Sequence, residues 1–174
     1  RASGINIIRK GNSLTCRLYA FLHYTTNKKK YDLIIDEINT IPFFTNFYAK
    51  SKSVCLIHQL AKEYWFKEII WPINLIGYFL ETIFLKTYKN TPAITVSKST
   101  KTDLQKLGFK EITIISEGLG IKPHYQKTKD NQIIFLGRLV KAKGPQDAIV
   151  AFRQIEKEFP NYRLIIAGQG KNGY

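Results

Sequence analysis

Short apolar runs rich in β-branched residues alternate along the chain with segments of helical periodicity. The runs lack a strict apolar and polar alternation, which is typical of strands that are covered on both faces of a sheet. Predicted strands lie near residues 4–8, 31–38, 53–58, 93–97, 112–116, 132–137 and 163–167. Predicted helices lie near residues 13–26, 73–89, 99–107 and 145–159. Strands separated by helices indicate an α/β protein with doubly wound parallel sheets.

Two of these helices carry boundary signals. Thr100 precedes Asp103 by three positions, the spacing of a capping box, and Gly108 follows the helix as a C-terminal glycine. Pro145 stands where the last helix begins, a position that tolerates its missing N–H. We therefore expect the third helix to be capped at Thr100 and the fourth to begin at Pro145.

A polar stretch rich in glycine and lysine, GLGIKPHYQKTKD at residues 118–130, interrupts the alternation. Such a stretch between two runs of strands and helices is typical of a linker between domains. We predict a first domain over residues 1–120, incomplete at its start, a hinge over residues 121–131, and a truncated second domain over residues 132–174. The 174 residues include no methionine, and we expect an internal fragment of a longer protein.

The charge balance of the chain is strongly basic. Lys and Arg number 27 against 13 Asp and Glu, which gives a formal net charge of +14 at pH 7. This surplus favours an anionic partner, whether a nucleic acid, an acidic membrane surface or a phosphorylated substrate. Because the lysines are scattered along the chain, the charge alone does not choose among these partners.

Cysteine usage bears on the cellular compartment. Cys16 and Cys55 are the two cysteines, and neither has a Cys or His neighbour at metal-ligand spacing. We expect neither a disulfide framework nor a metal site, which fits a reducing compartment. No signal peptide is visible before the first apolar run. The expected location is cytoplasmic, with peripheral contact at the inner face of the membrane as an alternative.

The most apolar segment, IIWPINLIGYFLETIFL at residues 69–85, is too short between its acidic residues to span a membrane, which takes roughly 20 residues. Two interpretations stay open. The segment is a core helix under a sheet, or it lies at a lipid surface, where Trp65, Trp71, Lys62 and Lys86 would meet the headgroups.

The sequence FLGRLVKAKGP at residues 135–145 indicates a phosphate-bearing ligand. An apolar strand ends at Gly137, Arg138 follows at once, and Lys143 precedes a helix that opens with Gly-Pro. A guanidinium fork and an ammonium beside a helix N-terminus can neutralise a pyrophosphate without a metal ion. Arg138 and Lys143 are therefore candidate binding residues.

The same segment, FLGRLVKAKG, resembles the stretch that opens the donor-binding domain of family 4 retaining glycosyltransferases. Three further segments agree with that family in order and spacing: ITVSKSTKTDLQKLGF, ISEGLGIK and LIIAGQG. Upstream, YDLIIDEINTIPFF and CLIHQLAKEYW are similar to a subgroup of these enzymes. The resemblance covers nearly the whole chain. It implies a GT-B fold, in which two Rossmann-like domains face each other across a cleft, with the second domain truncated here.

The resemblance also implies a function. The family transfers a sugar from a nucleotide-diphosphate sugar to a glycan, lipid or small-molecule acceptor, with retention of the anomeric configuration and with no metal or other cofactor. The residues that match Arg138 and Lys143 bind the donor diphosphate and stabilise the departing nucleotide, so both are predicted to be catalytic. Gly137, Gly168 and Gly170 are the predicted donor-binding glycines, of which Gly137 would let the backbone approach the phosphates. No specific nucleic acid is expected as a partner.

Two residues are candidates for the sugar and acceptor side of the cleft. His58 ends a predicted strand and matches the family's cleft histidine, and a neutral imidazole there can hydrogen-bond a sugar hydroxyl. A structural role at the strand end is the alternative for His58. Asp36 and Glu37 end another strand and point to opposite sides, so at most one faces the cleft, and we assign Glu37.

The sequence departs from the family pattern at two places. The family's paired glutamates, Glu-x7-Glu, would lie beyond Tyr174, so we expect this chain alone to have little or no transferase activity. Glu117-Gly118-Leu119 also replaces the family's usual Pro-Asn-Gly turn.

Two alternative functions stay open. The segment GQGKNG at residues 168–173 satisfies G-x-G-x-x-G after a strand, the pattern of dinucleotide-binding oxidoreductases. A non-catalytic nucleic-acid-binding protein is compatible with the net charge of +14, although no zinc-finger spacing, RNP motif or GXXG loop is recognisable.

Overall fold

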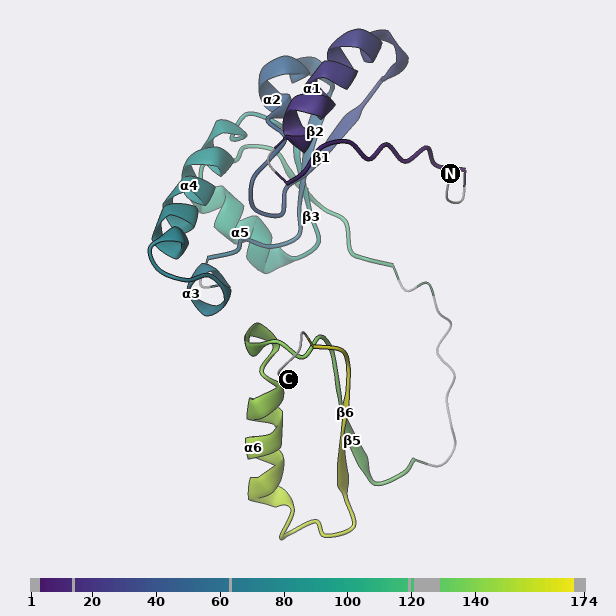
Figure 1. Cartoon of the computed structure of the whole chain (residues 1–174), viewed down its shortest axis with the longest axis vertical. Coiled ribbons are helices and arrows are strands. Elements are labelled where there is room, and N and C mark those ends of the chain that lie inside the picture. The colour runs from purple at the N-terminus through teal and green to yellow at the C-terminus, as the bar shows by residue number, and fades with distance from the viewer. Residues whose placement is uncertain (1–3, 14, 63, 119, 121–128, 171–174) are drawn as a thin grey trace. The chain divides into compact units, whose positions relative to one another are not determined.

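The computed structural model describes residues 4–13, 15–62, 64–118, 120 and 129–170. The chain divides into two compact units, a first unit of Arg1–Lys62 with Ile76–Gly118 and a second unit of Glu63–Leu75 with Leu119–Tyr174 (Figure 1). The division after Gly118 lies close to the predicted end of the first domain. Residues 121–128 of the predicted hinge lie outside the described residues. The assignment of domains and hinge stays a prediction.

A parallel four-stranded sheet forms the centre of the first unit. Its strands follow the order β1 (Ile34–Glu37), β2 (Ser53–Ile57), β3 (Ala93–Thr95) and β4 (Ile112–Ile114). Neighbouring strands are parallel throughout. Each connection therefore runs from the carboxyl end of one strand back to the amino end of the next. All four strands lie within their predicted ranges. The α/β class predicted from the sequence is confirmed.

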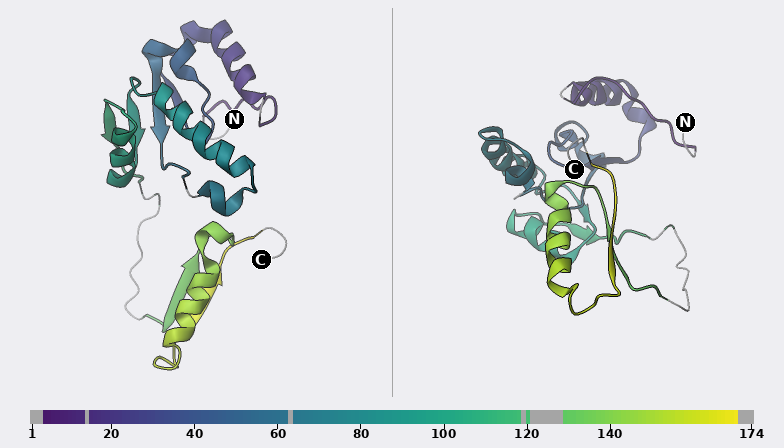
Figure 2. Two further views of the ribbon diagram at one scale, coloured as in Figure 1. Left: turned by 90° about the vertical axis from the view of Figure 1, so that its left-hand side faces the viewer. Right: turned by 60° about the horizontal axis from the view of Figure 1, so that its bottom comes forward.

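One helix precedes the first strand of this sheet, and further helices lie in the connections between its strands. They are α1 (Cys16–Asn27), the short α2 (Thr45–Tyr48), α4 (Ile73–Thr87) and α5 (Lys98–Lys106). Figures 1 and 2 agree that α1 lies apart from α4 and α5. The core between helices and sheet gathers Cys55 and Ile57 of β2 with Leu85, Tyr88 and Leu104, each at most 2% exposed. Burial on this scale is what fixes α4 and α5 against the sheet.

The first predicted strand, residues 4–8, is wrong. β1 begins only at Ile34, and residues 6–10 belong to no helix or strand. The side chains of Ile7 and Ile8 are 50% and 57% exposed. A β-branched run becomes a strand only when a neighbouring strand completes its hydrogen bonds, and in the described part of the chain residues 6–10 belong to neither sheet.

Helix α5 begins one residue earlier than predicted, and its cap is different. Ser97 has an extended backbone, and its hydroxyl accepts a 3.2 Å hydrogen bond from the Thr100 amide, so Ser97 and not Thr100 is the N-cap. The predicted C-terminal glycine is confirmed. Gly108 has φ of +91°, and the Phe109 amide donates back to the Leu104 carbonyl, as in a Schellman ending.

The second unit contains a β-α-β segment. Strands β5 (Gln132–Leu136) and β6 (Arg163–Ala167) pair in parallel, and α6 (Pro145–Ile155) connects them after the short 3₁₀ turn η3 (Lys141–Lys143). Helix α3 (Tyr64–Glu68) falls in the same unit. Helix α6 begins at Pro145 as predicted but ends at Ile155 instead of residue 159. Pro160 disfavours helical backbone at Phe159, whose ring packs edge-on against Tyr162.

Candidate functional site

Three titratable side chains meet at the carboxyl edge of the first unit's sheet. Glu37 is the last residue of β1, His58 follows β2, and Glu117 follows β4. The His58 Nδ1 atom lies 3.0 Å from a carboxylate oxygen of Glu117, and its Nε2 atom lies 3.6 Å from a carboxylate oxygen of Glu37. The His58 side chain is 41% exposed, so a solute can reach the ring. These three residues form the His58 cluster.

The structure therefore brings together His58 and Glu37, the two residues predicted for the sugar and acceptor side. Glu117 was missed as a site residue. A signal was present, because a carboxylate replaces the family's usual Pro-Asn-Gly turn directly after a predicted strand. The ends of parallel strands share one edge of a sheet, so a carboxylate at that position falls at the same edge as His58.

Side chains from two helices hold the loop that follows β2. The Thr100 hydroxyl of α5 donates to the His58 carbonyl at 3.0 Å. The amides of Ala61 and Lys62 donate to the two carboxylate oxygens of Glu81 in α4, at 2.7 and 3.1 Å. Glu81 is only 6% exposed, so its carboxylate satisfies two main-chain donors in a nearly dry setting. The backbone that carries His58 is thus fixed on the side away from the ring.

Lys62 adds a further contact to this loop. Its backbone has φ of +38°, an unfavourable value for a residue with a side chain. Its ammonium lies 2.6 Å from a carboxylate oxygen of Asp103 in α5, an ion pair that is partly exposed. The hydrogen bond from the Lys62 amide to Glu81 and this ion pair together hold Lys62 in that conformation.

Asp36 and Glu37 point to opposite sides, as their adjacent positions in a strand predict. Asp36 is 2% exposed, and its carboxylate accepts hydrogen bonds from the Phe43 amide, from the amide and hydroxyl of Thr45 and from the Tyr88 hydroxyl. Burial, together with this carboxylate, raises the pKa of Tyr88 above its ordinary value. Asp36 is therefore a structural carboxylate of the core, whereas Glu37 belongs to the His58 cluster.

The second unit carries the other predicted site residues. Beyond the ends of β5 and β6 the two strands stay side by side, because the Gly137 amide donates to the Ala167 carbonyl and the Leu139 amide donates to the Gln169 carbonyl. A Cβ atom built on Gly168 would overlap the Gly137 carbonyl oxygen. Gly168 is therefore required for this close approach of two main chains. Leu139 and Gly170 also form a parallel bridge.

The space beside Gly137 is open. A Cβ built there would come no closer than 3.9 Å to another atom of the described chain, and that atom belongs to the Phe135 ring. The described chain would therefore not obstruct a side chain at this position, and the role of Gly137 in donor binding stays a prediction.

Arg138 and Lys143 are both exposed, on either side of the turn that leads into α6. In the described part of the chain, neither side chain takes part in an ion pair or a hydrogen bond. No carboxylate of the described residues forms an ion pair with either cation. Asp147 already places a carboxylate in the first turn of α6, so the arginine and lysine, more than the helix end, supply positive charge for an anion.

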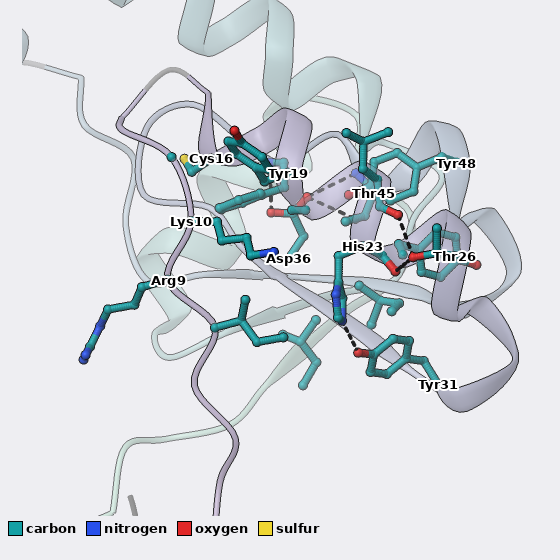
Figure 3. A pocket seen from close by; sticks show the side chains of 18 of the residues that line it. Arg9, Lys10, Cys16, Tyr19, His23, Thr26, Tyr31, Asp36, Thr45 and Tyr48 are labelled. Carbon is teal, nitrogen blue, oxygen red and sulfur yellow. Dashed lines mark hydrogen bonds between the residues drawn. The ribbon is translucent and has the colours of Figure 1, made fainter. Parts of the chain in front are cut away.

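A separate hollow of about 970 Å³ lies in the first unit between residues 8–13, α1 and β1 (Figure 3). Its wall includes Tyr19, Tyr48 and the pair of His23 and Tyr31, whose ring nitrogen and hydroxyl are 2.6 Å apart. Asp36 also lines it, with its carboxylate engaged as described above. None of the predicted site residues lines this hollow.

The described residues contain neither a metal-binding cluster nor a helix that could span a membrane. No group of three or more His, Cys, Asp and Glu side chains there has an arrangement suited to a metal ion. No helix in that part of the chain combines the length and the apolar character that a membrane crossing requires. The predicted independence from a metal stays a prediction.

Comparison with known proteins gives a match at the C-terminal end. Residues 120–174 match the family model described as glycosyl transferases group 1. The match supports glycosyl transfer as the general activity. It spans β5, α6 and β6, and with them Gly137, Arg138, Lys143, Gly168 and Gly170. The match favours neither a dinucleotide-binding oxidoreductase nor a nucleic-acid-binding protein. The chain matches no curated protein.

Proposed function

We propose that this chain is part of an enzyme that transfers a sugar from a nucleotide-diphosphate sugar to an acceptor, with retention of the anomeric configuration and without a metal. The observation that carries this proposal is the match of residues 120–174 to group 1 glycosyltransferases, because the matched segment contains Arg138 and Lys143, two cations that form no ion pair among the described residues. These two residues bind the donor diphosphate. Gly137 leaves space for it beside the backbone.

Arg138 and Lys143 also act on the reaction itself. As the bond between the sugar and the phosphate lengthens, negative charge grows on the phosphate oxygens. Fixed cations stabilise this charge more strongly than the charge of the bound donor, which accelerates the reaction instead of merely tightening binding. The guanidinium of Arg138 can contact two oxygens at once, a geometry that lysine lacks.

The His58 cluster serves the sugar and acceptor. Its ring and carboxylates offer hydrogen-bond partners for hydroxyl groups, and all three side chains are open to solvent. The well-fixed loop behind His58 keeps these partners in place, which lowers the entropy lost when a substrate is oriented.

Product analysis in the full-length protein tests this proposal. We expect turnover with one member of a panel of nucleotide-diphosphate sugars in the presence of EDTA, and a glycoside whose anomeric configuration, read by NMR, equals that of the donor. A product with inverted configuration would contradict the proposed retention. Turnover that EDTA abolishes would contradict the proposed independence from a metal. Affinity for RNA or DNA that falls steeply with salt, with no turnover of any donor, would instead favour nucleic-acid binding.

A second proposal concerns the membrane, and it rests on helix α4. The structure buries only Glu81 and Leu85 of this helix, while Ile76, Phe79 and Ile83 are 55%, 63% and 56% exposed. Their spacing places these three on one face, and Lys86 continues that face toward the helix end. We propose that this α4 face lies on an anionic lipid surface, with Lys86 near the headgroups.

Vesicle sedimentation tests the α4 face. The double change Phe79→Ser and Ile83→Ser is expected to weaken binding to phosphatidylglycerol-containing vesicles by at least about fivefold, because most of the apolar area that enters the lipid is lost. Val150→Ser in α6, also at an exposed apolar position, is the matched control and is expected to bind like the wild type. Equal binding by the double variant, or equal binding to neutral vesicles, would contradict the proposal.

A further inference from the structure

The His58 ring has a carboxylate at each nitrogen, but the two contacts differ in kind. The Glu117 oxygen lies 3.0 Å from Nδ1, within hydrogen-bond distance. The Glu37 oxygen lies 3.6 Å from Nε2, beyond the distance of a direct hydrogen bond. The two glutamates therefore have different effects on the ring.

An ionised carboxylate only accepts hydrogen bonds, so the short contact with Glu117 requires a proton on Nδ1. In a neutral imidazole one nitrogen carries the proton and the other carries a lone pair, and the bond made by one nitrogen decides the state of the other. A neutral His58 ring held by Glu117 thus has its lone pair on Nε2. That nitrogen accepts a hydrogen bond and does not donate one.

The backbone of the loop that carries His58 is held by contacts that do not involve Glu117. Thr100 holds the His58 carbonyl, and Glu81 holds the two amides at the end of the loop. These contacts do not reach the ring nitrogens. Among the described residues, Glu117 and Glu37 are the two that contact the ring nitrogens, and Glu117 makes the direct bond.

We propose that Glu117 is a positioning residue that holds the neutral His58 ring with its proton on Nδ1 and so presents Nε2 as an acceptor for a substrate hydroxyl. The identity of that substrate as a sugar rests on the proposed function. Glu37, beside Nε2, offers a second acceptor to the same hydroxyl-bearing ligand. Glu117 itself acts through the ring and not on the substrate.

Nitrogen-15 NMR of the histidine side chains in the full chain tests the inference without any activity. At a pH at which the spectrum shows a neutral ring, wild-type His58 is expected to have a protonated Nδ1 and an unprotonated Nε2. Glu117→Ala is expected to move most of the proton to Nε2. Glu117→Gln is expected to keep it on Nδ1, because the amide oxygen of glutamine still accepts from that nitrogen.

Two controls separate this effect from a general disturbance of the fold. Glu111→Ala removes an exposed carboxylate at the opposite end of β4, and its His58 spectrum is expected to equal that of the wild type. Glu37→Gln is expected to leave the proton on Nδ1. A wild-type ring with its proton on Nε2, or an unchanged ring in Glu117→Ala, would overturn the inference, and this result does not depend on which reaction the protein performs.

The link to the reaction is measured separately in the full-length protein. Glu117→Ala is expected to lower kcat/KM by roughly tenfold, and Glu117→Gln is expected to restore most of it, with kcat affected more than KM. If His58→Ala retains wild-type turnover while the NMR result holds, the positioning of the ring stands and the proposed role of His58 in sugar transfer fails. If Glu117→Ala and Glu117→Gln lower turnover equally, the tautomer does not explain the role of Glu117.

Discussion

The two predicted site regions are held in place in opposite ways. Around His58, side chains from other elements fix the loop: a hydroxyl, a buried carboxylate and an ion pair reach it from α4 and α5. Around Arg138, the fixing contacts are between main chains, and they depend on the absence of a side chain at Gly168. The first arrangement suits groups that must be oriented for hydrogen bonds. The second leaves two long cationic side chains, which have no ion-pair partner among the described residues, exposed to an anionic ligand.

This contrast predicts that one added methyl group destabilises the region around Arg138. Gly168→Ala is expected to lower the free energy of unfolding of the second unit by about 3 kcal/mol or more, because the new methyl group would overlap the Gly137 carbonyl and separate β5 from β6. Chemical denaturation, followed by the aromatic signals of Phe159 and Tyr162 in NMR, measures this change.

Gly137→Ala is the matched control for stability. Its methyl group would enter open space, so the unfolding free energy is expected to change little or to rise by about 0.4–1 kcal/mol through the stiffer unfolded chain. Equal losses in Gly137→Ala and Gly168→Ala would contradict the account of how this region is packed.

The region around His58 is instead expected to lose stability when the buried carboxylate of Glu81 is altered. Glu81→Gln replaces one acceptor oxygen by an NH₂ group that cannot accept from a loop amide. The expected loss in unfolding free energy is about 2 kcal/mol, the cost of a buried donor left without a partner. Thermal or urea unfolding measures it, and the amide shifts of Ala61 and Lys62 report the loop directly. Glu111→Gln, at an exposed glutamate, is the control, and an equal effect there would refute the role of Glu81.

The sequence predicts the six observed strands because a short apolar β-branched run between two helical segments of an α/β protein usually forms a buried strand. It misassigns residues 4–8 because a strand depends on a partner, and composition carries no information about the partner. Ser97 replaces Thr100 as the cap because the backbone turn that makes a cap is decided by where the helix actually starts.

The candidate site residues differ in the same way, by whether their contacts are local or distant in the sequence. Arg138 and Lys143 are visible in the sequence because their spacing is local. Glu117 is visible only as a carboxylate that follows a predicted strand, and its contact with His58 spans 59 positions of the chain. The role of Gly168 is hidden for the same reason, since its neighbour Gly137 lies on another strand. Tertiary contacts of this kind have no short-range pattern from which they could be read.

The central claim is that the charges of Arg138 and Lys143 act on the departing phosphate, and one comparison of variants tests it most directly. Arg138→Ala in the full-length protein is expected to lower kcat/KM by at least tenfold, or about 1.4 kcal/mol of transition-state stabilisation. Lys141→Ala removes an exposed cation of η3, three positions after Arg138, and is expected to react like the wild type. Wild-type kcat/KM in Arg138→Ala, or equal losses in both variants, would contradict the account.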